Sequence, residues 1–254
     1  MAIWALADLH LSFGVPNKEM SVFGERWAGH PEIIRENWLK VIKADDLVLL
    51  PGDISWAMHP EEAVADLQWI DALPGTKVMI RGNHDYWWSS IRKLKDILPP
   101  SIHLVQNDVF RWNSVAVCGA RLWDTPEFSF GGYVQMTDNP RANKLIQVEE
   151  PQAIEKIFLR ELGRLELSLK CLPKDPKIFK IAMVHYPPIG PDLKPSRASA
   201  LLEKYGVNAC VFGHLHNVNP GTLPFGTKNG ITYTFTACDY VKFMPVEIKP
   251  RNGS

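Results

Sequence analysis

The chain has 254 residues and balances 28 Lys and Arg against 28 Asp and Glu, with a hydrophobic share of 46%. This composition is typical of a globular protein and excludes a disordered or fibrous chain. Because the net charge is zero, the chain as a whole has no excess positive field for nucleic acid or an acidic membrane. We therefore expect no membrane partner and disfavour a nucleic-acid partner.

The cysteines indicate a reducing compartment, because they are widely separated and form no CxxC pair. Three of the four lie in apolar runs, where a thiol behaves as a small core residue. They are Cys118, Cys171, Cys210 and Cys238. The N-terminal stretch lacks a basic segment and a completed apolar segment, and no apolar run is long enough to span a bilayer. We expect a cytoplasmic protein.

Short runs rich in Val, Ile and Leu alternate with stretches of helical period, which predicts an α/β protein. We expect a single domain over residues 1–254, because no internal repeat or low-complexity segment is present. In chain order the predicted elements are a strand at Ile3–Ala7, a helix at Pro31–Lys43, a strand at Leu47–Leu50, a helix at Glu61–Leu73, strands at Lys77–Ile80, His103–Val105 and Val115–Cys118, a helix at Pro151–Leu172, and strands at Phe179–Val184, Ala209–Phe212, Ile231–Thr236 and Val246–Ile248.

The segment Gly119–Gln147 has turn residues and aromatics without a clear period, so it is predicted to be a long loop. Loops of this length in compact domains are usually functional, which makes it a candidate rim of an active site. We expect its basic residues Arg121, Arg141 and Lys144 to be solvated surface charges. The alternative is that they contact a phosphate or a second anionic group of a substrate.

Polar residues follow five of the predicted strands at the point where each strand ends. The carboxyl ends of strands line the ligand crevice of open α/β sheets, so we expect these side chains to converge. They are Asp8, His10, Asp53, Asn83, His84, Asp85, His185, His214 and His216.

Two of these blocks are specific enough to carry weight. From the composition, a GNHD block such as Gly82–Asp85 is expected by chance on the order of 0.001 times, and a GHxH block such as Gly213–His216 about 0.02 times. A DxH or Gly-Asp pair alone means nothing at this chain length. The joint occurrence of the specific blocks is strong evidence for a shared site.

The set ADLH (Ala7–His10), GD (Gly52–Asp53), GNHD (Gly82–Asp85), His185 in VHYPP and GHLH (Gly213–His216) resembles the calcineurin-like metallophosphoesterase superfamily. The blocks occur in the family's order over roughly residues 1–240. The resemblance implies a two-sheet β-sandwich flanked by helices in four layers, with a binuclear metal centre that hydrolyses phosphate esters. GNHD fits the broader phosphoesterases better than the serine/threonine protein phosphatases, whose block is GNHE.

The resemblance also implies a role for each residue. Asp53 would bridge the two metals, and His84 would donate a proton to the leaving alkoxide. Carboxylate, imidazole and amide ligands without cysteine suit a pair of divalent transition-metal ions, Mn, Fe or Zn. The remaining ligands would be Asp8, His10 and His216 for one metal, and Asn83, His185 and His214 for the other.

The expected reaction is attack on phosphorus by a metal-bridging hydroxide, with the metals neutralising the phosphoryl oxygens. Two carboxylates against two divalent ions leave a surplus of about +2, so a neutral chain can still hold an anionic substrate. We expect a small or medium phosphomonoester or phosphodiester. The alternatives are a nuclease of the same superfamily, disfavoured by the balanced charge, and a non-catalytic scaffold, which would be expected to have lost ligands.

Other residues near the blocks have two interpretations each. Asp85 either orients His84 or caps the following helix. Six aromatic residues either pack in the core and walls or stack on a base or aryl group of a substrate. Three further histidines, His30, His59 and His103, are expected to be hydrogen-bonded structural residues. The aromatic residues are Trp56, Tyr86, Trp87, Trp88, Trp123 and Tyr186.

Overall fold

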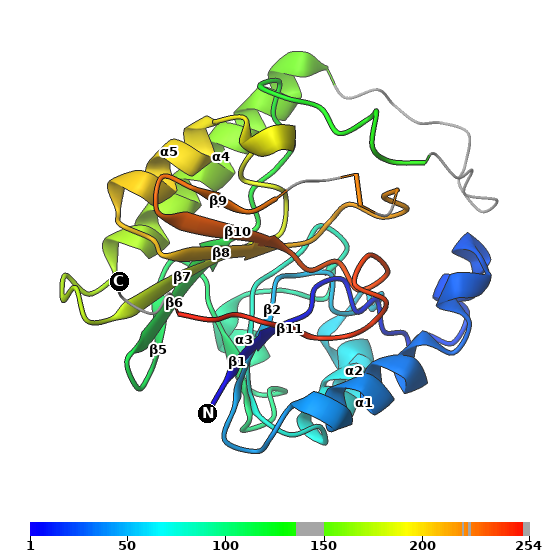
Figure 1. Ribbon diagram of the computed structural model, residues 1–254. Helices are drawn as coiled ribbons and strands as arrows, with labels where there is room; N and C mark the ends of the chain where they lie inside the picture. The colour runs from blue at the N-terminus through cyan, green and yellow to red at the C-terminus, as the bar shows by residue number, and fades with distance from the viewer. Residues whose placement is uncertain (136–149, 220, 223–224, 251–254) are drawn as a thin grey trace.

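The computed structural model describes residues 1–135, 150–219, 221–222 and 225–250. The chain forms two mixed β-sheets (Figure 1). The first has the strand order β11-β1-β2-β3-β4, in which only β11 is antiparallel to its neighbour. Its strands are β1 (Ile3–Ala5), β2 (Leu47–Leu50), β3 (Thr76–Met79), β4 (Ile102–Leu104) and β11 (Val246–Glu247).

The second sheet has the order β5-β6-β7-β8-β10-β9, with parallel central strands and an antiparallel strand at each edge. Its strands are β5 (Val109–Trp112), β6 (Val115–Ala120), β7 (Phe179–Val184), β8 (Ala209–Phe212), β9 (Thr227–Lys228) and β10 (Ile231–Phe235).

The two sheets pack face to face over one apolar layer. Alternate residues of the strands, such as Leu47 and Leu49 from β2 and Val115 and Val117 from β6, are buried in it because side chains in a strand alternate between faces. The outer face of each sheet is covered by helices (Figure 1). The result is a single α/β domain with four layers, as the resemblance implies.

Helices α1 (His30–Val41), α2 (Pro60–Asp71) and the short α3 (Ile91–Leu94) cover the first sheet. Helices α4 (Pro151–Lys170) and α5 (Arg197–Lys204) cover the second. In the described part of the chain, three turns of 3₁₀ helix connect the elements. They are Met20–Phe23, Glu25–Trp27 and Pro191–Leu193.

The predicted strands and the three predicted helices are present, with ends that differ by one or two residues. The sequence did not predict β5, β9, α3 or α5, because these elements are short or lie at an edge and lack a long apolar pattern. The segment predicted as a loop begins later than expected, since β6 continues through Ala120. Its residues 136–149 lie outside the described part of the chain.

The four cysteines are free, and three of them, Cys118, Cys210 and Cys238, are buried. This confirms the core role that their apolar surroundings predict. No helix in the described residues has both the length and the apolar character needed to cross a bilayer.

Candidate metal centre

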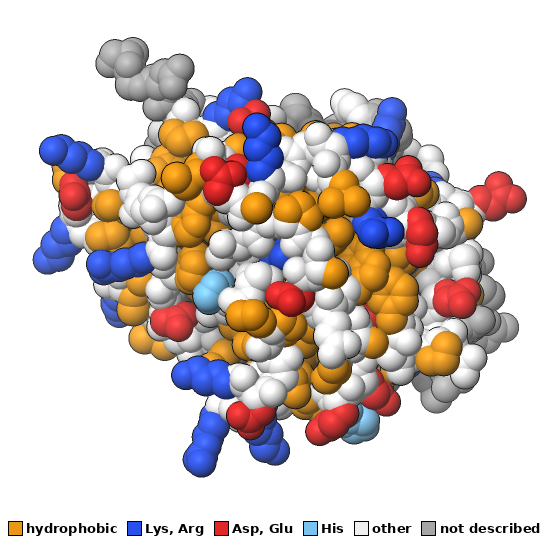
Figure 2. Space-filling model, turned by 90° about the horizontal axis from the view of Figure 1, so that it is seen from below, with side chains coloured by type: hydrophobic (Ala, Val, Ile, Leu, Met, Phe, Trp, Pro, Cys, Tyr) orange, Lys and Arg blue, Asp and Glu red, His pale blue; other side chains and the backbone are white. Residues whose placement is uncertain are grey.

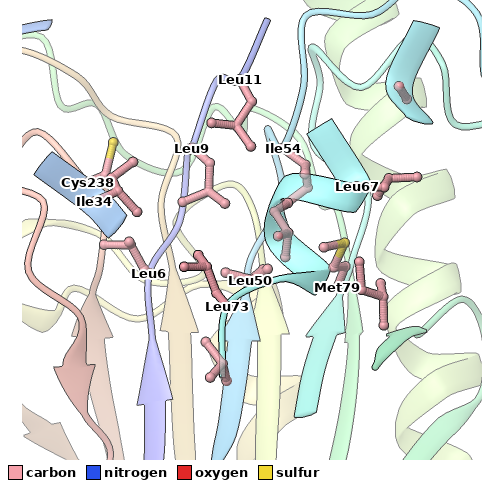
Figure 3. Close-up of a cluster of buried hydrophobic side chains, with 14 of the residues drawn as sticks. Leu6, Leu9, Leu11, Ile34, Leu50, Ile54, Leu67, Leu73, Met79 and Cys238 are labelled. Carbon is pink, nitrogen blue, oxygen red and sulfur yellow. The ribbon is translucent and has the colours of Figure 1, made fainter. Parts of the chain in front are cut away.

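The loop after β1 carries the first candidate ligands on an apolar anchor. Leu6, Leu9 and Leu11 are fully buried in the cluster beneath α1 and α2 (Figure 3). Asp8 and His10 alternate with them in the sequence and are buried on the other side of this segment, in the site described below. Burial of three leucine side chains stabilises the segment by several kcal/mol, at about 2 kcal/mol each. The packing of the core therefore fixes the position of both polar side chains.

Several candidate ligands have a left-handed backbone. Asp8 (φ 62°), His10 (φ 45°), Asp53 (φ 52°) and His214 (φ 77°) all have positive φ. Such residues are uncommon outside glycine, and strained backbone of this kind clusters at functional sites. The strand-end loops therefore turn sharply at the positions that aim the side chains inward.

The glycines of the motif blocks allow two loops to approach closely. A Cβ atom at Gly82 would overlap the backbone nitrogen and the carboxylate of Asp53, and one at Gly213 would overlap the carboxylate of Asp8. Only glycine fits where another backbone or a carboxylate approaches this closely. The GNHD and GHLH blocks therefore need their first residue for packing, independently of the ligands that follow.

Asp53 lies at the centre of the cluster. Its Oδ2 atom is 3.7 Å from His10 Nε2 and 3.4 Å from His185 Nε2. His10 Nε2 is in turn 3.1 Å from His216 Nε2. The carboxylate thus lies between histidines from both predicted metal sites.

The other side of the cluster is built around Asn83. Its side-chain oxygen is 2.7 Å from His185 Nε2 and 3.1 Å from His214 Nδ1. The backbone N–H of His214 donates to both carboxylate oxygens of Asp8, at 3.1 and 3.0 Å. The structure therefore brings all seven predicted ligand residues into one continuous cluster.

Two hydrogen bonds determine which imidazole nitrogens face the centre. His185 Nδ1 is 3.0 Å from the carbonyl oxygen of Pro51, which can only accept, so Nδ1 carries a proton and Nε2 is the nitrogen that faces the centre. His216 Nδ1 is 3.0 Å from Asp239 Oδ1, which fixes its Nε2 in the same way.

Asp239 was missed in the sequence. It follows the predicted strand Ile231–Thr236 by three residues, so the rule that polar residues gather at strand ends could have found it.

The cluster fits a cation. Buried lone pairs of oxygen and imidazole nitrogen converge, and Asp53 Oδ2 accepts no hydrogen bond from any described residue. A buried acceptor without a donor is costly unless a cation binds it. Two sets of ligand atoms each lie within 4.8 Å of one another and could hold an ion. The sets are Asp8 with His10 and His216, and Asp8 with Asp53 and His185.

The two sets share Asp8, whereas the resemblance gives the bridging role to Asp53. Both oxygens of Asp8 already accept from the His214 backbone. Asp53 Oδ2 has no such donor among the described residues and lies near histidines of both sets. Asp53 is therefore the better placed carboxylate for a bridge.

The electrostatics of the cluster favour positive charge at its centre. Burial raises the pKa of Asp8 to about 7, because a low-dielectric surrounding disfavours the charged form. Burial also opposes protonation of His185, but the negative charges of Asp53 and Asp8 raise its pKa to about 9. Burial alone would likewise raise the pKa of Asp53, yet the charges of His185 and His10 hold it well below the usual range.

His84 lies on the rim of the cluster. Its backbone N–H donates to Asp53 Oδ1 at 2.8 Å, and its ring centroid is 5.7 Å from that of His10 and 4.6 Å from that of Trp56. Its Nδ1 atom has no hydrogen-bond partner among the described residues, and burial lowers its pKa. The ring is therefore close to the cluster without being held by a structural hydrogen bond at Nδ1.

Asp85 performs neither of its two expected roles. Its carboxylate accepts from the backbone N–H groups of Gly82 (2.7 Å) and Ile54 (2.9 Å) and from the indole of Trp87 (2.9 Å). The next helix, α3, begins only at Ile91. Asp85 instead ties the loop after β2 to the loop after β3, which holds both in register.

The aromatic residues divide between the core and the site. Trp87 and Trp88 are buried in the core of the first sheet, as packing predicts. Trp56 stacks on the ring of His10 at 5.0 Å, and Tyr186 lies 3.8 Å from the ring of His214. These two side chains wall the cluster.

The expectation that Arg121 is a solvated surface charge is wrong. Its side chain is only 12% exposed and its Nη2 atom donates to the buried Glu161 at 3.1 Å. The sequence pattern of this segment gave no sign of that partner, which comes from α4. Arg141 and Lys144 lie outside the described residues.

A two-sheet α/β sandwich with Asp, Asn and His side chains gathered at strand ends is the architecture of a metal-dependent phosphoesterase. A family model described as calcineurin-like phosphoesterase matches residues 1–218, and the chain belongs to this family. It is therefore a metal-binding hydrolase that acts on phosphoester bonds, and the family generally uses a pair of divalent metal ions.

Solved structures show the same fold at low sequence identity. The chain is similar to phosphopantetheinyl hydrolase (PptH) from Mycobacterium tuberculosis, with a TM-score of 0.54, 14% identity and coverage of 99% of this chain and 96% of that one. It is also similar to TT1561 of Thermus thermophilus, with a TM-score of 0.51, 13% identity and coverage of 94% and 89%. A comparison with curated proteins found no match.

Proposed function

We propose that the cluster holds two divalent transition-metal ions, Mn, Fe or Zn, and that the substrate is a small or medium phosphomonoester or phosphodiester. The observation that carries this proposal is the convergence of buried acceptors on Asp53 Oδ2, which has no donor among the described residues. Asp53 would be shared by both ions. The other ligands would be Asp8, His10 and His216 for one ion, and Asn83, His185 and His214 for the other.

Such a pair supplies Lewis acidity toward the phosphoryl oxygens and lowers the pKa of a water molecule towards neutrality. The chain contributes orientation. Asp239 and the Pro51 carbonyl hold two imidazoles with Nε2 inward, and the apolar anchor of the β1 loop keeps Asp8 and His10 in place. His84 would give its proton to the leaving oxygen, a role consistent with its place on the rim.

Two clefts flank the cluster and support an ester with apolar groups. One has a volume of about 310 Å³ and is lined by His84 together with Phe23 and Trp56. The other has a volume of about 750 Å³ and is lined by His214 together with Phe128. In this proposal the leaving alcohol lies in the cleft beside His84, and the second ester group of a diester lies in the cleft beside His214.

A pair of substitutions separates these positions. We expect Phe23→Ala to raise KM about tenfold for both p-nitrophenyl phosphate and bis-p-nitrophenyl phosphate, because both have a leaving group that loses an apolar contact. Phe128→Ala should raise KM for the diester only. Equal effects of both substitutions on both substrates would contradict this placement.

The test of the function itself is hydrolysis of these two esters by protein loaded with Mn, Fe or Zn. Turnover that depends on the metal supports the proposal. Metal-free protein without activity on either ester would favour a non-catalytic scaffold. A nuclease of the same family is the alternative, and the balanced charge of the chain disfavours it. On the one face seen in Figure 2, Lys and Arg are mixed with Asp and Glu.

A further inference from the structure

A second polar cavity lies between the carboxyl ends of β3 and β6 and the middle of α4. Its volume is about 300 Å³, and none of the seven candidate metal ligands lines it. Three arginines and one glutamate do, together with Ser89 and Trp88. These charged residues are Arg81, Arg121, Arg164 and Glu161.

The cavity contains buried donors without acceptors. Arg81 Nε, Arg121 Nε and Ser89 Oγ are buried and have no hydrogen-bond partner among the described residues. All three side chains line this one cavity. Because buried polar atoms are nearly always paired, three unpartnered donors around one space indicate a ligand rich in acceptors.

The charged side chains that line the cavity also favour a negatively charged ligand. Arg121 Nη2 and Arg164 Nη1 donate to a single oxygen of Glu161, at 3.1 and 2.8 Å, and Glu161 is 1% exposed. The lining holds three guanidinium groups and one carboxylate, so the lining itself carries an excess of positive charge. The carboxylate of Asp85, which does not line the cavity, offsets part of this excess at Arg81.

We propose that this cavity binds the phosphate group of a small molecule. Guanidinium forks match phosphate oxygens, and the excess of positive charge in the lining suits an anion. The cavity volume of about 300 Å³ is roughly ten times the ~30 Å³ that a water molecule takes. The cavity therefore has room for more than a phosphate group alone. Ile80, Trp88 and Val105 provide an apolar wall for an organic group attached to the phosphate.

The cavity adjoins the backbone of the candidate metal centre. Arg81 precedes Asn83 by two residues, and the carbonyl oxygen of Arg121 accepts from the backbone N–H groups of His185 (3.2 Å) and Tyr186 (3.0 Å). A phosphate bound here therefore touches residues whose backbones position two candidate ligands. The proposal itself does not depend on the metals.

The experiment is equilibrium dialysis with radiolabelled inorganic phosphate, which counts bound phosphate per chain. The Asp53→Asn variant is used because it disables the candidate metal centre, so that phosphate held there is not counted. This variant should still bind one phosphate per chain, because the arginine cavity is intact. In the Asp53→Asn background, the further substitution Arg121→Met should weaken the binding of that phosphate by about tenfold or more, as expected for loss of a charged hydrogen-bond donor.

Arg160→Met is the matched control. Arg160 also contacts Glu161 (3.4 Å), but its side chain is 56% exposed and does not line the cavity. Its loss should leave phosphate binding unchanged. No phosphate bound to Asp53→Asn, or equal weakening by Arg160→Met and Arg121→Met, would overturn the proposal.

Two further measurements cover folding and the source of the phosphate group. If Arg121→Met does not fold, Ser89→Ala removes only one hydroxyl and should still weaken phosphate binding about fivefold. Unchanged affinity would then overturn the proposal.

Phenylphosphonate, whose C–P bond resists hydrolysis, identifies the type of ligand. Binding tighter than inorganic phosphate supports an organic phosphate as ligand, and equal binding supports free phosphate.

Discussion

Two buried polar clusters among the described residues have unpartnered atoms of opposite character. Around Asp53, the unpartnered carboxylate oxygen lies among imidazole nitrogens, so the cluster offers acceptors and calls for a cation. Around Arg121, the unpartnered atoms are donors on guanidinium and hydroxyl groups, so the cavity calls for an anion. The comparison shows that buried atoms left without partners indicate the charge of a ligand.

The largest effect is expected from Asp53→Asn, which removes the negative charge at the centre of the cluster that would bind cations. The bound metal should fall from two ions per chain to one or none, and ester hydrolysis should fall by at least about a thousandfold. Elemental analysis and bis-p-nitrophenyl phosphate turnover measure both. Asp66→Asn is the control, since Asp66 is buried but belongs to neither cluster. Unchanged metal content in Asp53→Asn would refute the assignment.

His84→Ala tests whether chemistry and metal binding are separable at the rim of the cluster. We expect kcat to fall by roughly 100- to 10,000-fold with metal content unchanged, because a general acid contributes about that much. The loss should be greater for an alkyl ester than for a p-nitrophenyl ester, whose leaving group needs less protonation. An equal loss for both esters would argue against proton donation by His84.

Asp239→Asn tests whether Asp239 orients the imidazole ring of His216 for metal binding. The carboxylate holds His216 through Nδ1 at 3.0 Å, and loss of such a partner typically costs 10- to 100-fold in metal affinity. Competition with a chelator of known affinity measures the change. Metal affinity equal to that of the wild type would mean that His216 does not depend on Asp239 for its orientation.

Asp66 is a buried carboxyl that provides the baseline for burial without a cation. It accepts from the Ser55 hydroxyl and from the Phe13 backbone at 2.8 Å, and burial raises its pKa from 3.8 to about 6. Because the folded pKa lies above the unfolded one, the stabilising contribution is complete below about pH 4 and is lost as pH rises through about 6.

The free energy of unfolding of the wild type, minus that of Asp66→Asn, should therefore fall by up to about 3 kcal/mol between pH 4 and pH 7, since each pKa unit corresponds to about 1.4 kcal/mol. Urea unfolding of both proteins across this range measures it. A difference that stays constant with pH would show that the folded pKa of Asp66 is not raised.

The candidate ligands could be predicted because their chemistry is concentrated in short blocks at strand ends. Asn83 and His84 in GNHD, and His214 and His216 in GHLH, are too specific to arise by chance in a chain of this length. The alternation of buried strands and amphipathic helices likewise predicted the α/β layers. These features are local, so the sequence shows them directly.

Contacts between distant segments could not be predicted in the same way. Arg121 and Glu161 are 40 residues apart, and only the packing of α4 on β6 brings them together. One signal was present, since Glu161 falls on the same helical stripe as the buried Phe158 and Leu165. A charged residue on an apolar stripe indicates a buried partner, but the pattern does not say which one.

Counting metal ions in the native protein is the decisive measurement for the proposed metal centre. We expect about two transition-metal ions per chain, with hydrolysis of bis-p-nitrophenyl phosphate lost on chelation and restored by Mn, Fe or Zn. Full hydrolysis by protein that holds no metal would contradict it.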